Sequence, residues 1–191
     1  MSSLSPTAER ICDAAIRHFA EVGYEGSSLN EIATDVGIRK ASLYSHFRGK
    51  DELFLAALSV ALEVEQAFVA EAYASPAPDG AGSGYVQEID KRYPTSPHLR
   101  FLLRAAYLLP KSIAKQVGAG YEGFLASLRQ HYLVQLDADR PGLAEDDRNG
   151  FAESYVGIVE SLFVELTYGS TKAMAVRRDA LWRILSQAVG K

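Results

Sequence analysis

The 191-residue chain has little that would support secretion, disulfide bonding or a membrane span. Its single cysteine, Cys12, excludes an intrachain disulfide, and its place in a helical pattern favours a small buried thiol over a redox sensor. No uninterrupted apolar run reaches about 18 residues, and no charged-then-apolar leader opens the chain. We therefore expect a cytoplasmic protein.

Motifs for catalysis or metal binding are also missing. The four histidines are scattered, with no H-E-x-x-H or Cys/His spacing. Cys12 has no recognisable histidine partner, and Gly82-Ser83-Gly84 lacks the G-x-S-x-G frame of a nucleophile elbow. The segment S-P-A-P-D-G-A-G-S-G at 75–84 follows no strand and lacks the lysine of a phosphate-binding loop, so it reads as a plain loop. We expect no catalytic residue, metal or cofactor.

The overall charge is mildly acidic, −4 at pH 7, which argues weakly against a nucleic-acid partner. Local charge is different. Residues 38–50 contain four basic residues and no acidic one, a formal charge of +4. Since screening acts over about 10 Å at ordinary salt, this segment can attract phosphate while the rest of the chain stays acidic.

Helical periodicity dominates the chain and predicts an all-α fold. At about 28–47 two short helical patterns meet at Gly37. Ser28 followed by Glu31 predicts a capping box at the start of the first, and Gly37 suits the left-handed residue that ends it. A second helix is expected from Arg39 to His46, with Leu43 and Phe47 facing inward. Two helices joined at a glycine, the second basic and polar outside, are typical of a DNA-reading helix-turn-helix.

A short helix-turn-helix also occurs as plain packing in all-α proteins, so the motif alone leaves this alternative open. The surrounding residues add R-I-x-x-A-A-x-x-x-F-x-x-x-G-Y before the motif and K-D-E-L after it. Together they resemble the N-terminal domain of the tetracycline-repressor (TetR/AcrR) family of bacterial regulators. The resemblance covers roughly the first third of the chain.

The resemblance implies a set of DNA contacts. Tyr44 and His46 would lie against the DNA backbone, and Lys50 would sit near a phosphate at the start of the fourth helix. Ser27 and Ser28 would offer hydroxyls and a helix N-terminus to another phosphate. The candidates for reading base edges in the major groove are Arg39, Lys40, Ala41 and Ser42.

Arg39 departs from the family pattern, which usually places Ser or Thr there. An arginine side chain cannot accept the amide protons that a serine hydroxyl would accept. The recognition helix should therefore lack its usual side-chain cap, and Arg39 gains weight as a phosphate or guanine contact.

The resemblance, together with the remaining helical patterns, implies two domains: a helix-turn-helix DNA-binding domain at 1–50 and a helical effector-binding and dimerisation domain at 51–191. We expect the first helix to carry an apolar stripe that includes Val22 and to end at Gly23. Further helices are expected over 50–74, 85–93 and 97–109, with breaks at Pro110 and at Gly118 and Gly120. Helices over 121–136, 147–168 and 171–189 follow.

The last two helices carry apolar stripes broader than one neighbour needs. They are either ordinary core helices or halves of a four-helix interface with a second chain. The resemblance favours a homodimer that reads a palindromic operator. Candidate interface residues are Phe151, Tyr155, Ile158, Leu162, Phe163, Leu166, Leu181, Ile184 and Leu185.

Aromatic side chains with polar tips are frequent in the middle of the chain. Each one can be an ordinary core residue, but as a group they fit a pocket for a small, moderately hydrophobic effector. The candidates are Tyr73, Tyr93, Phe101, Tyr107, Tyr121, Phe124, His131, Tyr132 and Tyr155.

The resemblance implies a ligand-responsive repressor, and the sequence as a whole predicts a protein that binds double-stranded DNA and is not an enzyme. Two alternatives remain: a helical protein-binding module that has lost DNA binding, and an activator with the same fold.

Overall fold

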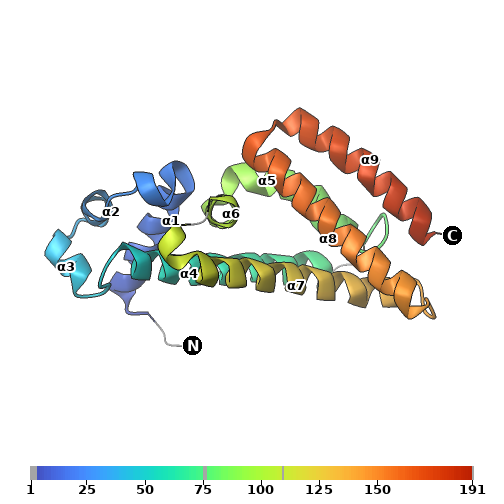
Figure 1. The fold of residues 1–191 in the computed structure, drawn as a ribbon, viewed down its shortest axis with the longest axis horizontal. Helices are drawn as coiled ribbons and strands as arrows, with labels where there is room; N and C mark the ends of the chain where they lie inside the picture. The colour runs from blue at the N-terminus through green and yellow to red at the C-terminus, as the bar shows by residue number, and fades with distance from the viewer. Residues whose placement is uncertain (1–3, 75–76, 109, 191) are drawn as a thin grey trace. The chain divides into compact units, whose positions relative to one another are not determined.

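The computed structural model describes residues 4–74, 77–108 and 110–190, and the predicted all-α fold is confirmed (Figure 1). The chain forms two compact units. The first comprises Met1–Glu65 and Ser96–Glu122, and the second comprises Gln66–Thr95 and Gly123–Lys191. Two long helices, α4 (Lys50–Ala74) and α7 (Ala114–Asp139), contribute residues to both units.

The first unit is built around α1 (Pro6–Gly26), which packs against α2 (Leu29–Val36) and α6 (Pro97–Tyr107). It also contains α3 (Lys40–Tyr44) and the short 3₁₀ helix η1 (Lys111–Ile113). The Ser5 hydroxyl accepts the Ala8 amide at 3.3 Å, and Pro6 occupies the first turn, so α1 begins with both a cap and a preset φ.

Three phenylalanines from three helices form the centre of this unit. The Phe19 ring lies 4.7 Å from Phe54 and 5.5 Å from Phe101 between centroids, and Phe54 lies 4.9 Å from Phe101. All three side chains are buried. Residues beyond position 50, where the sequence places the end of the DNA-binding domain, are therefore needed to complete the core around α1.

Polar contacts fix α2 against α1. The Arg10 guanidinium donates to the Val36 carbonyl at 2.8 Å, and the His18 ring lies 2.9 Å from the Asp35 carboxylate. Cys12 is fully buried nearby, and burial raises the pKa of its thiol to about 12. The thiol is therefore protonated at neutral pH, as expected for a small core residue.

The end of α1 differs from the sequence prediction. The helix kinks at Gly23, which has φ 75° and ψ −176°, and then continues to Gly26. Val22, predicted to lie on the apolar stripe, is 48% exposed, because the rings around Phe19 already fill this end of the core.

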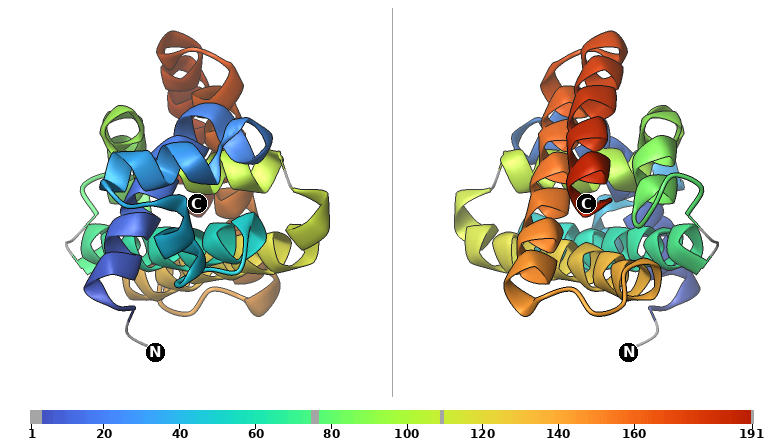
Figure 2. Two further views of the ribbon diagram at one scale, coloured as in Figure 1. Left: turned by 90° about the vertical axis from the view of Figure 1, so that its left-hand side faces the viewer. Right: turned by 90° about the vertical axis from the view of Figure 1, so that its right-hand side faces the viewer.

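The second unit contains α5 (Ser83–Thr95), α8 (Glu145–Tyr168) and α9 (Thr171–Val189). Helices α8 and α9 run side by side, and α5 contacts both (Figure 2). The Ser170 hydroxyl caps α9 by accepting the Ala173 amide at 3.2 Å. In the core, Tyr132 and Tyr155 stack with centroids 4.3 Å apart and planes 9° from parallel.

Helix α7 corrects the prediction of a break at Gly118 and Gly120. It is continuous through both glycines and through Gly123. A Cβ on Gly120 would lie 3.0 Å from Leu62, whereas Gly118 has nothing within 4 Å. Packing of the surrounding apolar residues thus outweighs the low helix propensity of glycine, which costs about 1 kcal/mol per residue. Leu109, where the sequence ends the preceding helix, lies outside the described residues; α6 ends at Tyr107.

Helix α4 is long and apolar enough, by length and composition alone, to cross a membrane. Buried helices of water-soluble domains satisfy the same criterion. Within the first unit its Leu53, Phe54, Ala57 and Leu58 are all buried. Core packing therefore accounts for these apolar positions.

Candidate nucleic-acid interface

Helix α2 is held at both ends by the residues that the sequence singled out. The Ser28 hydroxyl accepts the Asn30 amide at 3.2 Å. No return bond from Glu31 is formed in the described structure, so the predicted capping box is only half made. Gly37 ends the helix at φ 75° and ψ 31°, and the Ile38 amide donates to the Ala33 carbonyl at 2.9 Å. This is the left-handed helix end that Gly37 predicted.

Helix α3 is short, and two side chains anchor it. Leu43 is fully buried and Phe47 is 4% exposed, as their spacing predicted. The helix covers Lys40–Tyr44, and Ser45 and His46 form a turn after it, where the sequence predicted a helix from Arg39 to His46. The Ser45 hydroxyl donates to the Ser42 carbonyl at 2.7 Å, which closes the last turn.

Arg39 occupies the N-cap of α3 with an extended backbone and makes no side-chain cap bond. The absence of the usual cap is therefore confirmed. The helix starts instead from the Arg39 carbonyl, which accepts the amides of Ser42 at 2.8 Å and Leu43 at 3.3 Å. The guanidinium remains available for a ligand.

The outer face of α3 and its following turn is exposed and basic. We call this the α3 face; its exposed residues are Arg39, Lys40, Ala41, Ser42, Tyr44, Ser45 and His46. Within the described residues neither Arg39 nor Lys40 pairs with a carboxylate. The Lys40 ammonium lies 6.0 Å from the centroid of the Tyr44 ring.

Not all of the +4 segment is equally available. The Arg48 amide and guanidinium both donate to Glu52, at 2.6 and 3.2 Å, and these bonds lower the pKa of that carboxyl. Arg39 and Lys40 are thus the cations of this segment least neutralised by the protein itself.

Ser27 and Lys50, both predicted to contact DNA phosphates, make contacts within the protein. Ser27 is buried, and its hydroxyl donates to the Gly23 carbonyl at 2.7 Å, inside the kink of α1. The Ser27 hydroxyl is therefore removed from the predicted DNA contacts. The Lys50 ammonium lies 4.5 Å from the centre of the Tyr24 ring and 3.5 Å from the Glu25 carbonyl, so it ties the start of α4 to the end of α1.

Sequence reasoning missed the contact between Tyr24 and Asp51 that completes this junction. The Tyr24 hydroxyl donates to the Asp51 carboxylate, and burial, followed by this bond, raises the pKa of the phenol. Tyr24 belongs to the G-Y element and Asp51 to the K-D-E-L element of the pattern, but the pattern alone gives neither residue a role.

The candidate pocket residues divide between the two units. Phe101 belongs to the phenylalanine core of the first unit, where Tyr107 and Tyr121 form a ring pair 6.2 Å apart. In the second unit Phe124 is fully buried beside Phe163, and Tyr93 is half-buried. Four cavities formed by the described residues are each lined by at most one of these five side chains.

The other four candidates gather in the second unit. Tyr73 and Tyr155 share a hydrogen bond between their hydroxyls, and the His131 ring lies 5.4 Å from Tyr73. Burial raises the pKa of both buried phenols, which stay neutral. Tyr132, stacked on Tyr155, also lines an open cavity beside α9.

The candidate interface residues also differ in exposure. Tyr155, Leu162 and Phe163 are fully buried within the second unit, so they cannot form a surface and are removed from the predicted interface. Ile158 and Leu185 are nearly buried, while Phe151, Leu166 and Leu181 are half-buried. Ile184 is 62% exposed. The sequence missed Val164 and Tyr168, two further exposed apolar residues on α8, and Val176, on the apolar stripe predicted for α9, is also exposed.

Among known proteins, the N-terminal region matches a family of regulators. Residues 11–57 match the family described as bacterial regulatory proteins of the tetR family. A 46-residue segment is 46% identical to IcaR, the negative transcriptional regulator of the icaADBC biofilm operon in Staphylococcus epidermidis. The match covers 24% of this chain and 25% of that regulator, so the chain aligns with about a quarter of the relative's length.

Solved structures resemble the chain over most of its length. A TetR-family regulator from Agrobacterium tumefaciens has a TM-score of 0.70 at 21% identity, covering 95% of this chain and 96% of that chain. AibR, in complex with isovaleryl coenzyme A and operator DNA, has a TM-score of 0.65 at 18% identity, covering 93% and 97%. At these identities the likeness shows a shared fold.

Proposed function

We propose that the chain, whose residues 11–57 match the tetR family of bacterial regulatory proteins and whose fold resembles solved TetR-family structures, is a dimeric, sequence-specific DNA-binding repressor released from its operator by a small, fairly hydrophobic ligand. In this proposal residues 1–50 read DNA, and residues 51–191 hold the effector and the dimer contacts. The matched family is one of regulators, in line with the expectation that the chain is not an enzyme.

The α3 face is the observation that carries the proposal. Leu43 and Phe47 anchor a short helix whose outer surface offers two unpaired cations, two hydroxyl side chains and an aromatic ring. Arg and Lys pair with guanine edges or phosphates in the major groove, and the Ala41 methyl suits a thymine methyl. A module that binds only proteins has no need of this arrangement.

Relatives support repression and the binding of a small molecule. IcaR is a negative regulator, and AibR was captured with both isovaleryl coenzyme A and operator DNA. Release of the operator by the ligand is the part of the proposal that belongs to this chain alone. In a two-state mechanism the ligand binds preferentially to a dimer whose recognition helices are misplaced for the operator. Coupling of about 1 to 3 kcal/mol gives a five- to 150-fold loss of operator affinity.

The test is binding of the purified full chain to duplexes from its own upstream region, titrated with salt against a scrambled duplex. We expect selective binding whose log affinity falls linearly with log salt. Lys40→Ala should weaken binding and reduce the slope by about 1 for each half-site. Lys115→Ala, an exposed lysine on α7, is the matched control and should leave the slope unchanged.

Other outcomes separate the alternatives. Equal, weak binding to every genomic duplex would contradict sequence-specific reading and favour the protein-binding module. Selective binding that raises transcription from the same promoter would favour the activator.

A further inference from the structure

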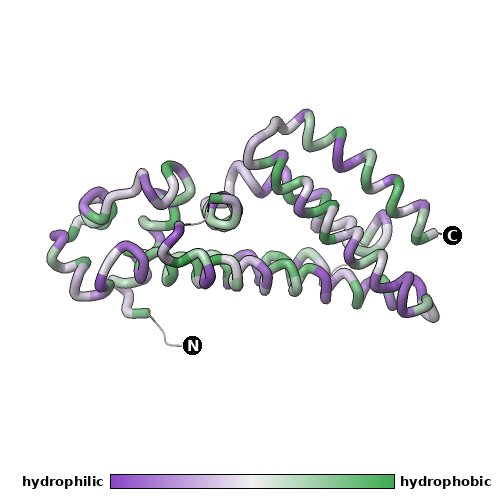
Figure 3. Tube along the Cα trace, in the orientation of Figure 1, coloured by the Kyte–Doolittle hydropathy of each residue, from purple (hydrophilic) through white to green (hydrophobic). Residues whose placement is uncertain are grey.

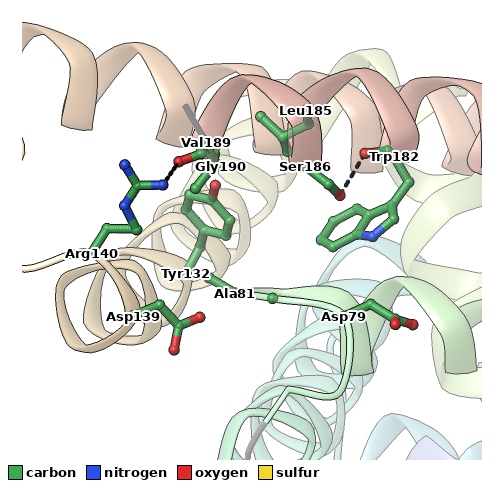
Figure 4. A pocket seen from close by; sticks show the side chains of 11 residues that line it. Asp79, Ala81, Tyr132, Asp139, Arg140, Trp182, Leu185, Ser186, Val189 and Gly190 are labelled. Atoms are coloured by element: carbon green, nitrogen blue, oxygen red, sulfur yellow. Dashed lines mark hydrogen bonds between the residues drawn. The ribbon is translucent and has the colours of Figure 1, made fainter.

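A cavity of about 200 Å³ opens in the second unit between the end of α7, the C-terminal half of α9 and the segment at 79–81 (Figure 4). We call it the α7–α9 cavity. It is smaller than the roughly 300 to 1,000 Å³ of sites that hold drug-sized molecules, so any ligand that fills it is small.

Two aromatic rings and an aliphatic side chain form its apolar walls. Tyr132 and Leu185 are nearly fully buried, and the Trp182 indole faces the cavity above Ala81 in Figure 4. The Tyr132 ring is held by its stack on Tyr155, which also meets the indole edge to face at 6.5 Å between centroids. The rings are therefore positioned before any ligand arrives.

The Tyr132 side chain carries a polar group that the fold leaves unused. The residue is 1% exposed, and within the described residues its hydroxyl makes no hydrogen bond. The only buried side-chain polar atom without a partner among these residues is the Arg104 Nε atom, so the Tyr132 oxygen itself stays accessible. A ligand N–H in the cavity would supply it with a partner.

The charges around the cavity are unequal. Asp79 and Asp139 contribute two carboxylates, and Arg140 contributes one guanidinium. That guanidinium already donates to the Val189 carbonyl at the end of α9. Among the described side chains, Asp79 accepts a hydrogen bond only from the neutral Gln87 amide, at 2.6 Å. The lining thus has a formal charge of −1.

Asp139 is in a position that folding does not favour. It is the last residue of α7, where the helix dipole disfavours an acid. The neighbouring Asp137 is paired with both nitrogens of a guanidinium on Arg148, at 2.6 and 2.8 Å, whereas Asp139 has no partner within the described residues. Asp139 nevertheless lines the cavity, so its charge acts on the cavity wall. Burial, and after it the Asp139 carboxylate, raise the pKa of the Tyr132 phenol to about 12.

We propose that the α7–α9 cavity binds a small aromatic monocation, of the arylalkylammonium type. The indole of Trp182 and the ring of Tyr132 offer π faces to the cation or the ligand ring, and the Tyr132 hydroxyl accepts an ammonium N–H. The Asp139 carboxylate supplies the counter-charge at the mouth. That such a cation is an effector of operator binding rests on the proposed function; binding at the cavity does not.

Trp182 is the only tryptophan in the chain, so its fluorescence reports directly on the cavity. The full chain is titrated, without DNA, with phenylethylammonium, its neutral isostere phenylethanol and the anion phenylacetate, and calorimetry is run in parallel. We expect a saturable change in Trp182 emission and binding of the cation about five- to thirtyfold tighter than the alcohol. Equal affinities for the cation and the alcohol, or no saturable change with any probe, would overturn the proposal.

Asp139→Lys separates a ligand-binding role from a structural one. It should weaken phenylethylammonium binding about tenfold or more, because the lining changes from −1 to +1. At the same time it should raise the melting temperature of the free protein by about 1 to 4 °C, because a cation suits the end of α7. If Asp139 instead stabilises the fold, its replacement should lower the melting temperature. A lower melting temperature, or an unchanged affinity for the cation, would count against the proposal.

Glu122→Lys is the matched control, with the same charge change at an exposed position of the same helix. Seventeen residues separate it from Asp139, about 25 Å along a helix. It should leave cation affinity unchanged; an equal loss would assign the effect to overall charge and overturn the proposal. Operator binding is then measured with and without the cation. If the cation binds but leaves the operator affinity unchanged, only the regulatory step is contradicted.

Discussion

The N-cap of α3 is occupied by a residue whose side chain cannot cap the helix. Arg39 makes no side-chain cap bond, so the first amides of α3 depend on the Arg39 carbonyl and on solvent. A Ser or Thr cap is worth about 0.5 to 2 kcal/mol. A cation retained at this position, with no carboxylate partner among the described residues, is consistent with a direct DNA contact.

Arg39→Ser should therefore separate stability from affinity. The serine hydroxyl can cap α3, so we expect the free energy of unfolding to rise by about 0.5 to 1 kcal/mol, measured by urea denaturation. Operator affinity should fall by about 1 to 3 kcal/mol if Arg39 pairs with a guanine. Arg39→Ala, which loses the contact without gaining a cap, is the comparison. Operator affinity equal to that of the natural chain in both variants would exclude a direct role for Arg39.

At the scale of elements, local signals predicted most helix ends and misjudged α7. Ser28 and Gly37 each satisfy backbone groups of their own helix end, so a few adjacent residues are enough to predict them. Whether a helix continues through glycine depends on neighbours distant in sequence, such as Leu62 against Gly120. The same limit explains the site: the exposed α3 face follows from periodicity, but the capture of the Ser27 hydroxyl depends on the backbone kink at Gly23.

The glycines of α7 provide a direct test of this explanation. Gly118→Ala places a methyl group where nothing lies within 4 Å, and should stabilise the chain by about 0.5 to 1 kcal/mol. Gly120→Ala brings the same gain in propensity but pushes against Leu62, so it should be neutral or destabilising. Thermal unfolding of both variants checks the order. Equal stabilisation would mean that Gly120 is not needed for close packing.

The kink in α1 depends on a glycine for a different reason. Gly23 has φ 75°, and an added Cβ would lie 2.9 Å from the Arg104 Nε atom of α6. Gly23→Ala should therefore cost about 1 to 3 kcal/mol from backbone strain alone, measured as a lower urea midpoint. Gly118→Ala is its control, with the same chemical change in an unstrained helix. Stability at or above that of the natural chain would show that α1 can straighten without loss.

At the scale of the whole molecule, the second unit keeps large apolar side chains on its outside although its core is complete. Val164, Tyr168, Val176 and Ile184 are 39 to 65% exposed on α8 and α9. Figure 3 shows apolar positions recurring along the length of α9. A groove between the two helices, lined partly by Ala173, Ala180 and Leu181, adjoins them. Single exposed apolar residues are ordinary, but a recurring set on two adjacent helices is typical of an interface.

A second copy of the chain is the partner that the proposed function requires, because one short recognition helix reads too few base pairs for tight, selective binding. The double variant Val176→Glu with Ile184→Glu places two charges on the exposed side of α9 and should leave the fold intact. We expect the natural chain to sediment as a dimer at micromolar concentration and the double variant as a monomer. Operator affinity should then fall about a hundredfold or more, because the second half-site no longer binds intramolecularly.

Val134→Glu is the control, since Val134 is 60% exposed but lies on α7. It should leave both sedimentation and operator affinity unchanged, which separates loss of the interface from a general effect of added negative charge. A double variant that remains dimeric would place the interface on another surface. A natural chain that is monomeric and still binds a full operator tightly would show that dimerisation is not the source of its affinity.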